Sequence, residues 1–300
     1  AALCSPSSTN EEFFLMQKLV RTLGSNNIDH RLRQIDFRGQ NLESAAPLFP
    51  SLEEIEKADL VVLVGAYPRH EAPLLNLRIR EAVSRGAKVI ALESYSKKLN
   101  YDTILRKLVR PSEIVTFLEK ILDCLRTENF GKLADDDEIV AHEINSANRP
   151  VVLTGMMVNQ HPRRSEILSI IRDLCALSGA SFGTQLEGAN AVGAWTYGAV
   201  PHRNPGGKKI ERPGEVFTEI VATPKRVYLL FGIDPILDCA KSSTIKKSLE
   251  EAKFVIAFSA FKNTCLEDVA DIILPTALYA ENEGSLVNGF GSLQAFEQAV

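Results

Sequence analysis

The fold of this chain is decided by the stretch Ala58-Asp-Leu-Val-Val-Leu-Val-Gly65-Ala-Tyr-Pro68-Arg-His-Glu-Ala-Pro73. Its consecutive apolar residues end at a Gly-x-x-Pro turn, a pattern typical of a strand that is buried on both faces. Apolar side chains at helical spacing follow over 74–85, and Gly86 stands where a left-handed helix cap belongs. A second apolar run ends at Leu92. The stretch therefore predicts one βαβ unit of a parallel sheet.

The same pattern recurs later in the chain. The stretch Lys225-Arg-Val-Tyr-Leu-Leu-Phe-Gly232-Ile-Asp-Pro235 repeats the strand and its turn, and 242–251 and 253–258 supply a helix and another strand. A strand–helix pair also occurs twice, over 1–23 and over 151–178. Two similar series of elements in one chain predict two related α/β units.

Length and composition agree with a globular α/β protein. The chain has 300 residues, 45% hydrophobic and 24% charged, which leaves room for two α/β domains or one large one. A net charge of −4 gives no basic footprint for nucleic acid. No apolar run approaches the ~20 residues of a membrane helix, and the start lacks the basic region of a signal peptide. Because the chain opens inside a predicted strand and stops at Gln-Ala-Val, we expect an excised piece of a longer protein.

The cysteines and histidines form no metal-ligand or catalytic pattern. The five cysteines lie in mostly apolar contexts without C-x-x-C spacing, which predicts buried reduced thiols and no iron–sulfur site here; they are Cys4, Cys124, Cys175, Cys239 and Cys265. The five histidines have polar contexts, so we expect surface or loop positions; they are His30, His70, His142, His161 and His202. The dinucleotide and P-loop glycine fingerprints are also missing from the sequence. The sequence thus predicts no catalytic residue.

Three regions depart from the regular pattern. The stretch 127–148 contains Asp135-Asp-Asp-Glu138 and few apolar residues, which predicts a solvated loop or linker. The stretch 183–214 holds seven of the 18 glycines around the single tryptophan, Trp195. It is either a loop wrapped over a flat ligand or a partner, or a long packed connection. A short strand over 271–275 precedes a turn-rich segment at 281–294.

The two Gly-x-x-Pro turns are the candidate ligand sites. Each follows a predicted parallel strand, and open α/β sheets bind ligands at the carboxyl ends of their strands. Two such turns facing each other would suit a large cofactor held between domains. The candidate cofactor-binding residues are Gly65, Tyr67, Pro68, Gly232, Asp234 and Pro235.

Several ordered motifs carry a resemblance to a known family. Besides the two turns, they are Thr9-Asn-Glu-Glu12, Gly24-Ser-Asn-Asn-Ile-Asp-His30, Glu187-Gly-Ala-Asn-Ala-Val-Gly-Ala-Trp195, Ala270-Asp-Ile-Ile-Leu-Pro275 and Glu281-x-Glu-Gly-Ser-x-x-Asn288. In this order and spacing they resemble the molybdopterin oxidoreductase superfamily. Within it, the sequence is most similar to the large 75-kDa-type subunits of proton-pumping NADH–quinone oxidoreductase, respiratory complex I.

The resemblance implies two Rossmann-like αβα domains that are interleaved in sequence. One domain would contain 1–30 and 191–300, and the inserted domain would contain 31–190. The repeats agree with this arrangement, because the strand–helix pair comes first in one unit and last in the other. The sequence patterns alone also allow two contiguous halves.

One departure from the family pattern bears on function. In active molybdenum or tungsten members, the Asn-Asn-x-Asp stretch is soon followed by the cysteine or selenocysteine that binds the metal. That position falls at Ile35 here, and an isoleucine cannot coordinate a metal. Asp36 is a possible oxygen ligand after a one-residue slip. Ser292 stands where many members carry an arginine, which weakens contacts to an anionic pterin.

The resemblance therefore implies a catalytically silent structural and docking module of the complex I peripheral arm. We expect no cofactor or metal in this stretch, vestigial pterin-side turns, and 4Fe–4S and 2Fe–2S clusters elsewhere in the parent chain, a subunit of an NADH dehydrogenase. The expected partners are other subunits of the arm on the cytoplasmic side of the inner membrane, without direct membrane insertion. The alternative is an active, formate dehydrogenase-like molybdopterin oxidoreductase with an atypical metal ligand. A third possibility is a stand-alone nucleotide-binding α/β protein.

Overall fold

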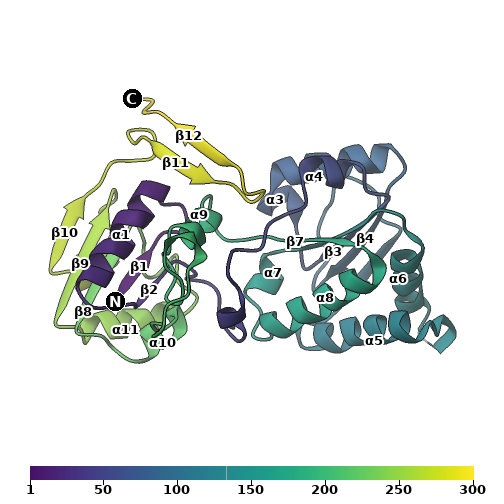
Figure 1. The fold of residues 1–300 in the computed structure, drawn as a ribbon, viewed down its shortest axis with the longest axis horizontal. Helices are drawn as coiled ribbons and strands as arrows, with labels where there is room; N and C mark the ends of the chain where they lie inside the picture. Colours follow the sequence, from purple (N-terminus) through teal and green to yellow (C-terminus); the bar gives the residue numbers. More distant parts are fainter. Residues whose placement is uncertain (133) are drawn as a thin grey trace. The chain divides into compact units, whose positions relative to one another are not determined.

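The chain folds into two compact units. The structure, a computed structural model, describes residues 1–132 and 134–300, with the backbone alone at 42, 132 and 135. Unit 1 comprises Ala1–Ala46 and Glu187–Val300, and unit 2 comprises Pro47–Leu186 (Figure 1).

Unit 2 is built on a five-stranded parallel sheet in the order β5-β4-β3-β6-β7. The strands are β3 (Leu60–Val64), β4 (Lys88–Glu93), β5 (Leu105–Leu108), β6 (Pro150–Thr154) and β7 (Ser181–Thr184). All five residues of the central strand β3 are buried, as its unbroken apolar sequence predicts. The predicted βαβ unit is thus confirmed, and Gly86 has the left-handed φ of +99° expected of a helix cap.

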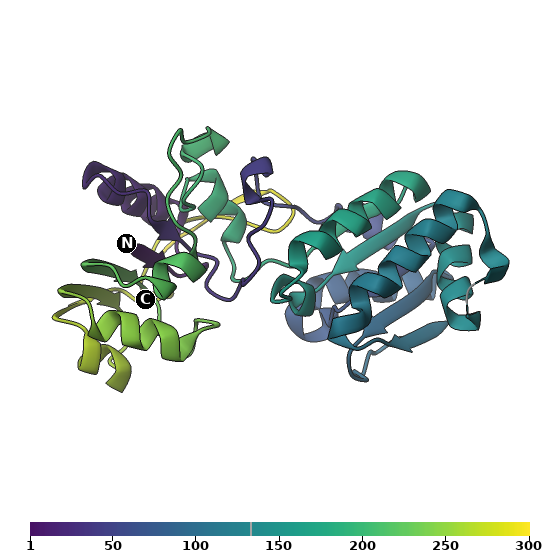
Figure 2. The same cartoon turned by 90° about the horizontal axis from the view of Figure 1, so that it is seen from below.

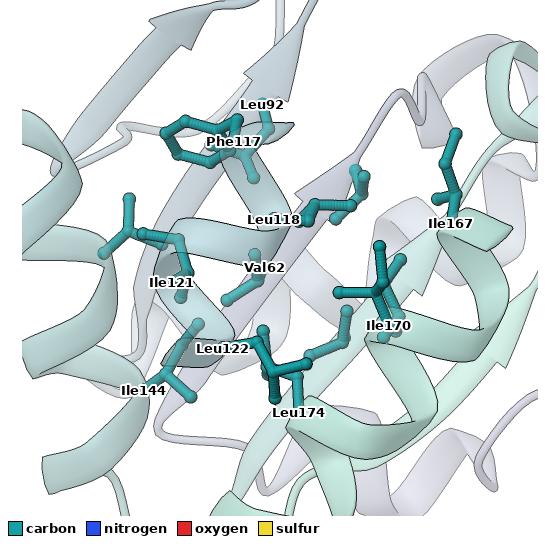
Figure 3. Close-up of a cluster of buried hydrophobic side chains, with 14 of the residues drawn as sticks. Val62, Leu92, Phe117, Leu118, Ile121, Leu122, Ile144, Ile167, Ile170 and Leu174 are labelled. Carbon is teal, nitrogen blue, oxygen red and sulfur yellow. The ribbon is translucent and has the colours of Figure 1, made fainter. Parts of the chain in front are cut away.

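Helices cover both faces of the unit 2 sheet. They are α2 (Leu52–Glu56), α3 (Pro68–Glu71), α4 (Pro73–Ser84), α5 (Ile114–Thr127), α6 (Asp135–Ser146), α7 (Met156–Asn159) and α8 (Arg164–Ser178). Figure 3 shows side chains of α5, α6 and α8 packed against Val62 and Leu92 of the sheet. Helices α2 and α4 lie on the other face (Figure 1).

Unit 1 contains a second five-stranded parallel sheet, in the order β10-β9-β8-β1-β2. Its strands are β1 (Ala2–Cys4), β2 (Ile28–Asp29), β8 (Val227–Phe231), β9 (Phe254–Ser259) and β10 (Ile272–Pro275). Its helices are α1 (Asn10–Thr22), α9 (Ala191–Thr196), α10 (Phe217–Ala222), α11 (Ser242–Glu250) and α12 (Thr264–Val269). An antiparallel hairpin follows, formed by β11 (Gly284–Val287) and β12 (Leu293–Phe296). Short 3₁₀ turns lie at Gln40–Leu42 and Pro205–Gly207 in unit 1 and at Pro111–Glu113 and Phe130–Lys132 in unit 2.

The two faces of the unit 1 sheet have separate apolar cores. Helix α1 packs Phe13, Met16 and Val20 against one face, together with Ala194 of α9. Helices α10, α11 and α12 pack on the other face. The purple helix α1 and the green helix α11 flank the sheet in Figure 2. Thr9 and Glu12 form a capping box that opens α1.

The predicted internal repeat is confirmed by the strand order. Position by position, β10-β9-β8-β1-β2 matches β5-β4-β3-β6-β7. The chain passes through the equivalent strands in different orders, because β1 and β2 open unit 1 whereas their counterparts β6 and β7 close unit 2. The two units are therefore permuted versions of one parallel α/β arrangement.

The unit boundaries differ from the predicted positions of 30/31 and 190/191. The compact units divide at 46/47 and at 186/187. Residues 31–46 stay with unit 1 because Leu32 is fully buried in its core and its carbonyl accepts the N–H of Ala240 at 3.0 Å. The guanidinium of Arg203 also donates to the carbonyls of Asn41 and Glu43 at 2.8 and 2.9 Å.

The three stretches that depart from the regular sequence pattern contain helices or strands in the structure. The loop expected over 127–148 contains helix α6, which buries Val140, Ala141 and Ile144 behind its charged first turn. Within this stretch, residue 133 and the side chains of Lys132 and Asp135 lie outside the described residues. The glycine-rich stretch, for which a wrapped loop and a packed connection were both left open, contains the end of β7 and helix α9, and its Trp195 is only 5% exposed. The turn-rich end of the chain forms the β11–β12 hairpin.

The positions of the histidines and cysteines agree with the predictions. His70 and His142 are exposed on α3 and α6, and His30, His161 and His202 lie in irregular segments, as predicted, although the side chains of these three are only 1–6% exposed. Their polar neighbours in sequence concealed burial that tertiary packing creates. The cysteines agree with the prediction, since all five thiols are free and four are buried, with Cys265 half-buried.

Candidate functional site

The carboxyl edge of the unit 1 sheet contains an open cleft. Gly232 follows β8 with a left-handed φ of +63°, and its N–H donates to the Phe258 carbonyl at 2.8 Å. A cavity of about 850 Å³ lies in front of this turn, within the range of ligand sites. Its walls come from the segments after β1, β8, β9 and β10, the first turn of α1 and the β11–β12 hairpin. A cleft at this place is where parallel α/β sheets bind ligands.

The ionisable groups of this cleft are all acidic. Its lining residues within the described chain include Glu12, Asp234 and Asp238 but no lysine, arginine or histidine. None of the three carboxylates forms an ion pair with another described side chain. A phosphate group would therefore meet like charges and no cation, which costs several kcal/mol in a partly desolvated site. The lining does not suit the phosphates of a pterin or a dinucleotide.

The two aspartates also shape the turn after β8. One oxygen of Asp234 accepts the N–H groups of Ile236 and Leu237 at 2.8 and 3.1 Å. One oxygen of Asp238 accepts the N–H of Asp234 at 2.7 Å. These bonds hold both carboxylates at the cleft wall while leaving a second oxygen on each.

The arginine nearest to these carboxylates is already engaged. Arg33 donates to the carbonyls of Leu237 and Asp238 at 2.9 and 3.3 Å and pairs with Glu187 at 3.0 Å. Burial raises the pKa of Glu187 to about 7, although the positive charge of Arg33 acts in the opposite direction. Arg33 thus stabilises the backbone behind the cleft and leaves the cleft's charge negative.

The rim of the cleft is apolar and exposed. Leu237, Phe261 and Tyr279 line it and are 72%, 68% and 89% exposed. Exposed large apolar side chains around a concave site are typical of surfaces that bind another molecule.

The equivalent edge of unit 2 is closed by its own side chains. Gly65 has a φ of +57°, and its N–H donates to the Leu92 carbonyl at 2.7 Å, the same bond that Gly232 makes in unit 1. A Cβ at Gly65 would lie 2.3 Å from the Cε of Met157, so this side chain fills the space in front of the turn. The carboxylate of Glu71 accepts the Met156 N–H at 3.2 Å and fixes the segment.

Aromatic and basic groups surround this second turn. Tyr67 stacks on His70 at 4.5 Å, and the Lys97 ammonium lies 5.6 Å from the Tyr67 ring. Pro68 is the buried first residue of α3. The structure places the predicted residues Gly65, Tyr67 and Pro68 at this closed edge.

The other three predicted residues lie at the edge of unit 1. Gly232 and Asp234 line its open cleft. Pro235 is buried beside it and does not line it. Sequence reasoning missed Glu12 and Asp238 as residues of this cleft.

The expected metal position offers no ready ligand. Ile35 is half-buried in an irregular segment of unit 1. The buried carboxylate of Asp36 accepts the Arg38 guanidinium at 2.9 and 3.0 Å, so both of its oxygens are engaged. No cluster of three or more His, Cys, Asp or Glu side chains suitable for a metal occurs within the described residues.

A buried ion pair holds the segment that leads to Ile35. Asp29 is fully buried and accepts two bonds from the Arg31 guanidinium at 2.8 and 2.9 Å, and it also caps α10 through the N–H of Phe217. Burial would raise the pKa of Asp29, but the charge of Arg31 holds it below its ordinary value. The Arg31 guanidinium lies 5.4 Å from the Trp195 ring. This cluster was not predicted. The opposite charges of Asp29 and Arg31, two positions apart in the sequence, could have indicated the ion pair.

Comparison with known proteins gives a family and a mixed group of relatives. The model of the molybdopterin oxidoreductase family matches residues 1–300. The chain is 25% identical to the F420-dependent formate dehydrogenase subunit alpha of Methanocaldococcus jannaschii, over 99% of this chain and 53% of that protein. It is 25% identical to the mitochondrial NADH-ubiquinone oxidoreductase 78 kDa subunit of Candida albicans, over 96% and 35%. It is 26% identical to the G subunit of NADH-quinone oxidoreductase from Rickettsia bellii, over 97% and 37%.

Solved structures support the fold. Acetylene hydratase from Pelobacter acetylenicus matches all of this chain and 52% of its own, with a TM-score of 0.74 and 14% identity. A chain of the formyltransferase/hydrolase complex from Methylorubrum extorquens matches with a TM-score of 0.67 and 16% identity, over 98% and 84%. The chain spans about half or less of the length of the curated relatives named above. No helix within the described residues combines the length and apolar character needed to cross a membrane.

Proposed function

Because this chain belongs to the molybdopterin oxidoreductase family, we propose that it is a catalytically silent structural and docking module of a proton-pumping NADH–quinone oxidoreductase. The observation that carries the proposal is Ile35. It occupies the position at which the resemblance to active members places a metal-binding cysteine or selenocysteine, and its side chain has no donor atom. Fold alone does not fix function, so the chemistry of this position decides between the two kinds of relative.

The cleft of unit 1 supports the same proposal. Its acidic lining opposes the phosphates of a pterin nucleotide, and its rim is apolar and exposed. The equivalent edge of unit 2 is filled by Met157. In a scaffold that no longer holds a cofactor, we expect one sheet edge to be closed by side chains and the other to be available for docking.

The proposal extends to the surroundings of the module. The parent chain would carry 4Fe–4S and 2Fe–2S clusters outside these residues, and electrons from NADH would pass through those clusters to quinone. Its partners would be other subunits of the peripheral arm, on the cytoplasmic side of the inner membrane. The Rickettsia bellii G subunit and the Candida albicans 78 kDa subunit are the relatives that support this assignment.

The second candidate is an active molybdopterin-dependent oxidoreductase. It is supported by the Methanocaldococcus jannaschii formate dehydrogenase, whose identity of 25% equals that of the Candida albicans subunit. It requires an oxygen ligand from Asp36 in place of sulfur. That carboxylate is buried and paired with Arg38, so it would have to leave an ion pair in order to bind a metal.

A matched pair of variants in the natural assembly separates the two functions. Ile35→Val and Asp36→Asn would be introduced into the parent chain, and NADH–quinone and formate-oxidising activities would be measured in purified assemblies. The silent module predicts that both variants keep NADH–quinone activity within about twofold, since neither residue touches reacting atoms. Formate oxidation in the parent chain that disappears in Asp36→Asn, with assembly intact, would contradict the proposal.

A further inference from the structure

The repeat shows what fills the carboxyl edge of such a sheet. Thr154 at the end of β6 pairs with Val64, and Cys4 at the end of β1 pairs with Phe231, so the segments that follow β6 and β1 are equivalent. The unit 2 segment continues Gly155-Met156-Met157, whereas the unit 1 segment continues Ser5-Pro6-Ser7. Ser7 therefore stands at the position of Met157, and a small hydroxyl residue replaces the side chain that closes unit 2.

This replacement leaves room in front of the Gly232 turn. A Cβ at Gly65 would lie 2.3 Å from the Met157 side chain, while one at Gly232 would have only the Ser5 Cβ in contact, at 3.5 Å. The cavity of about 850 Å³ is large enough for several side chains rather than one. The closed edge of unit 2 thus indicates that the open edge fits a flexible apolar side chain.

The charge of the cleft restricts the molecule that supplies this side chain. Glu12, Asp234 and Asp238 face the cavity without a cationic partner, and Arg33 is engaged by Glu187. Negative charge excludes anionic ligands and attracts lysine or arginine. Carboxylates that are fixed by backbone bonds, as the two aspartates are, bind a cation without further ordering.

We propose that this cleft binds an extended segment of a partner subunit, with a bulky apolar side chain against Gly232 and a lysine or arginine beside the three carboxylates. The exposed Leu237, Phe261 and Tyr279 would cover the flanking residues of that segment, in the way that aromatic and apolar residues dominate protein interfaces. This inference rests on the proposed docking function and names the chemistry of its partner.

The test uses a photo-crosslinking residue in the natural assembly. Benzoylphenylalanine would replace Tyr279, which lines the cleft and is 89% exposed, so the fold does not depend on it. A matched control would carry it at Phe14, an exposed aromatic residue of unit 1 that does not line the cleft. After irradiation, mass spectrometry identifies the attached peptide. We expect a segment of another subunit with lysine or arginine near the crosslinked residue, from position 279 and not from position 14.

Two independent variants then test the two parts of the proposal. The triple variant Glu12→Gln, Asp234→Asn, Asp238→Asn removes the charge but keeps a side-chain oxygen for the helix cap and the turn. It should lower the yield of the adduct by about tenfold or more, as expected when charge contacts to a cation are lost. Ser7→Met introduces the side chain that closes unit 2 and should block the adduct without changing any charge.

The outcomes separate this inference from the proposed function. A parent chain that assembles with respiratory subunits but gives no adduct at position 279 would overturn the inference and leave the docking function standing. An adduct with this chain itself, an adduct with a segment lacking basic residues, or a yield unaffected by both sets of substitutions would also overturn it. A parent chain that purifies without respiratory subunits but with molybdenum or tungsten and pterin would overturn the proposed function instead. If the triple variant does not assemble, Ser7→Met and the single variant Asp238→Asn decide.

Discussion

The two sheets of this protein have the same strand order but are covered to different degrees. Leu60 of β3 is 1% exposed, whereas Val227 at the equivalent position of β8 is 43% exposed. Ile90 and Leu92 of β4 are buried, whereas their counterparts Ile256 and Phe258 are half-buried. The strands themselves are similarly apolar, so the difference lies in what packs on them.

The helices explain this difference. In unit 2, α5 and α6 follow β5 and cover the face that carries Ile90 and Leu92. In unit 1, β10 is followed by a loop and the β11–β12 hairpin. An unbroken apolar strand thus indicates a parallel sheet, but the helices that follow the strands along the chain decide how much of that sheet is buried.

The largest expected effect is a matched pair of isoleucine truncations. Ile90→Ala removes a fully buried side chain under α5 and should destabilise unit 2 by about 3–4 kcal/mol, whereas the half-buried Ile256→Ala should cost about 1 kcal/mol. Denaturant unfolding followed by circular dichroism measures both losses. The fluorescence of the single tryptophan, Trp195, reports on unit 1. Equal losses of stability for the two variants would contradict the conclusion that the unit 2 sheet is more deeply buried than the unit 1 sheet.

A smaller difference is expected at the two turn glycines. Both have positive φ, so Gly65→Ala and Gly232→Ala should each lose about 1–2 kcal/mol through backbone strain. Gly65→Ala should lose about 1 kcal/mol more because its Cβ overlaps Met157. The control is Gly65→Ala combined with Met157→Ala, which should show a favourable coupling in a double-mutant cycle. An absence of coupling would mean that Met157 does not fill the unit 2 edge.

Unit 1 has two buried histidines, His30 and His202, whose pKa values are both lowered by burial, and His30 alone should give a pH effect on stability of about 2 kcal/mol. Burial lowers the pKa of His30 to about 4, against 6.5 in the unfolded chain, and its Nδ1 lies 3.0 Å from the Ala199 carbonyl. Between these values the unfolded state binds the proton and the folded state does not. Stability should therefore fall as the pH falls from about 6.5 toward 4, by about 2 kcal/mol at pH 5.

The variant His30→Asn isolates this histidine. Its amide can donate to the Ala199 carbonyl but does not titrate, so its unfolding midpoint should depend less on pH between 7 and 5. Glu187 acts with the opposite sign, because its raised pKa of about 7 gives stability at low pH that is lost as the pH rises. An unchanged pH dependence in His30→Asn would show that His30 is not the group that titrates.

The smallest effect is expected for the exposed ion pair between α5 and α8. Arg126 and Asp173 are 3.0 Å apart, and both side chains are at least half-exposed. Arg126→Ala should change the stability of unit 2 by less than about 0.5 kcal/mol, because water screens such pairs. A loss comparable to that of Ile90→Ala would mean that charge rather than apolar packing attaches α5 to the sheet.

Much of the fold could be predicted from periodicity. The strands before Gly65 and Gly232 and the helices after them were evident because buried parallel strands have unbroken apolar runs. The helix α6 was missed because its apolar residues follow an acidic run. The strand β5 was missed because only four residues, Leu105–Leu108, form it, and two of them are charged.

The candidate site was only half predictable. Gly232 and Asp234 belong to one turn and were identified from it, whereas Glu12 reaches the cleft from α1 and Ser259 from the end of β9. Such residues meet because the sheet places the ends of β1, β8 and β9 side by side. A local sequence pattern does not contain this information about which strands are neighbours. The blocking of the unit 2 edge by Met157 also depends on tertiary contact.

The most direct test of the silent-module account is the metal and pterin content of the parent chain, purified in its natural assembly. The account predicts iron, without molybdenum or tungsten and without pterin, because Ile35 supplies no ligand and the unit 1 cleft is acidic. Stoichiometric molybdenum or tungsten together with pterin would contradict it, and Asp36 would then be the first residue to substitute.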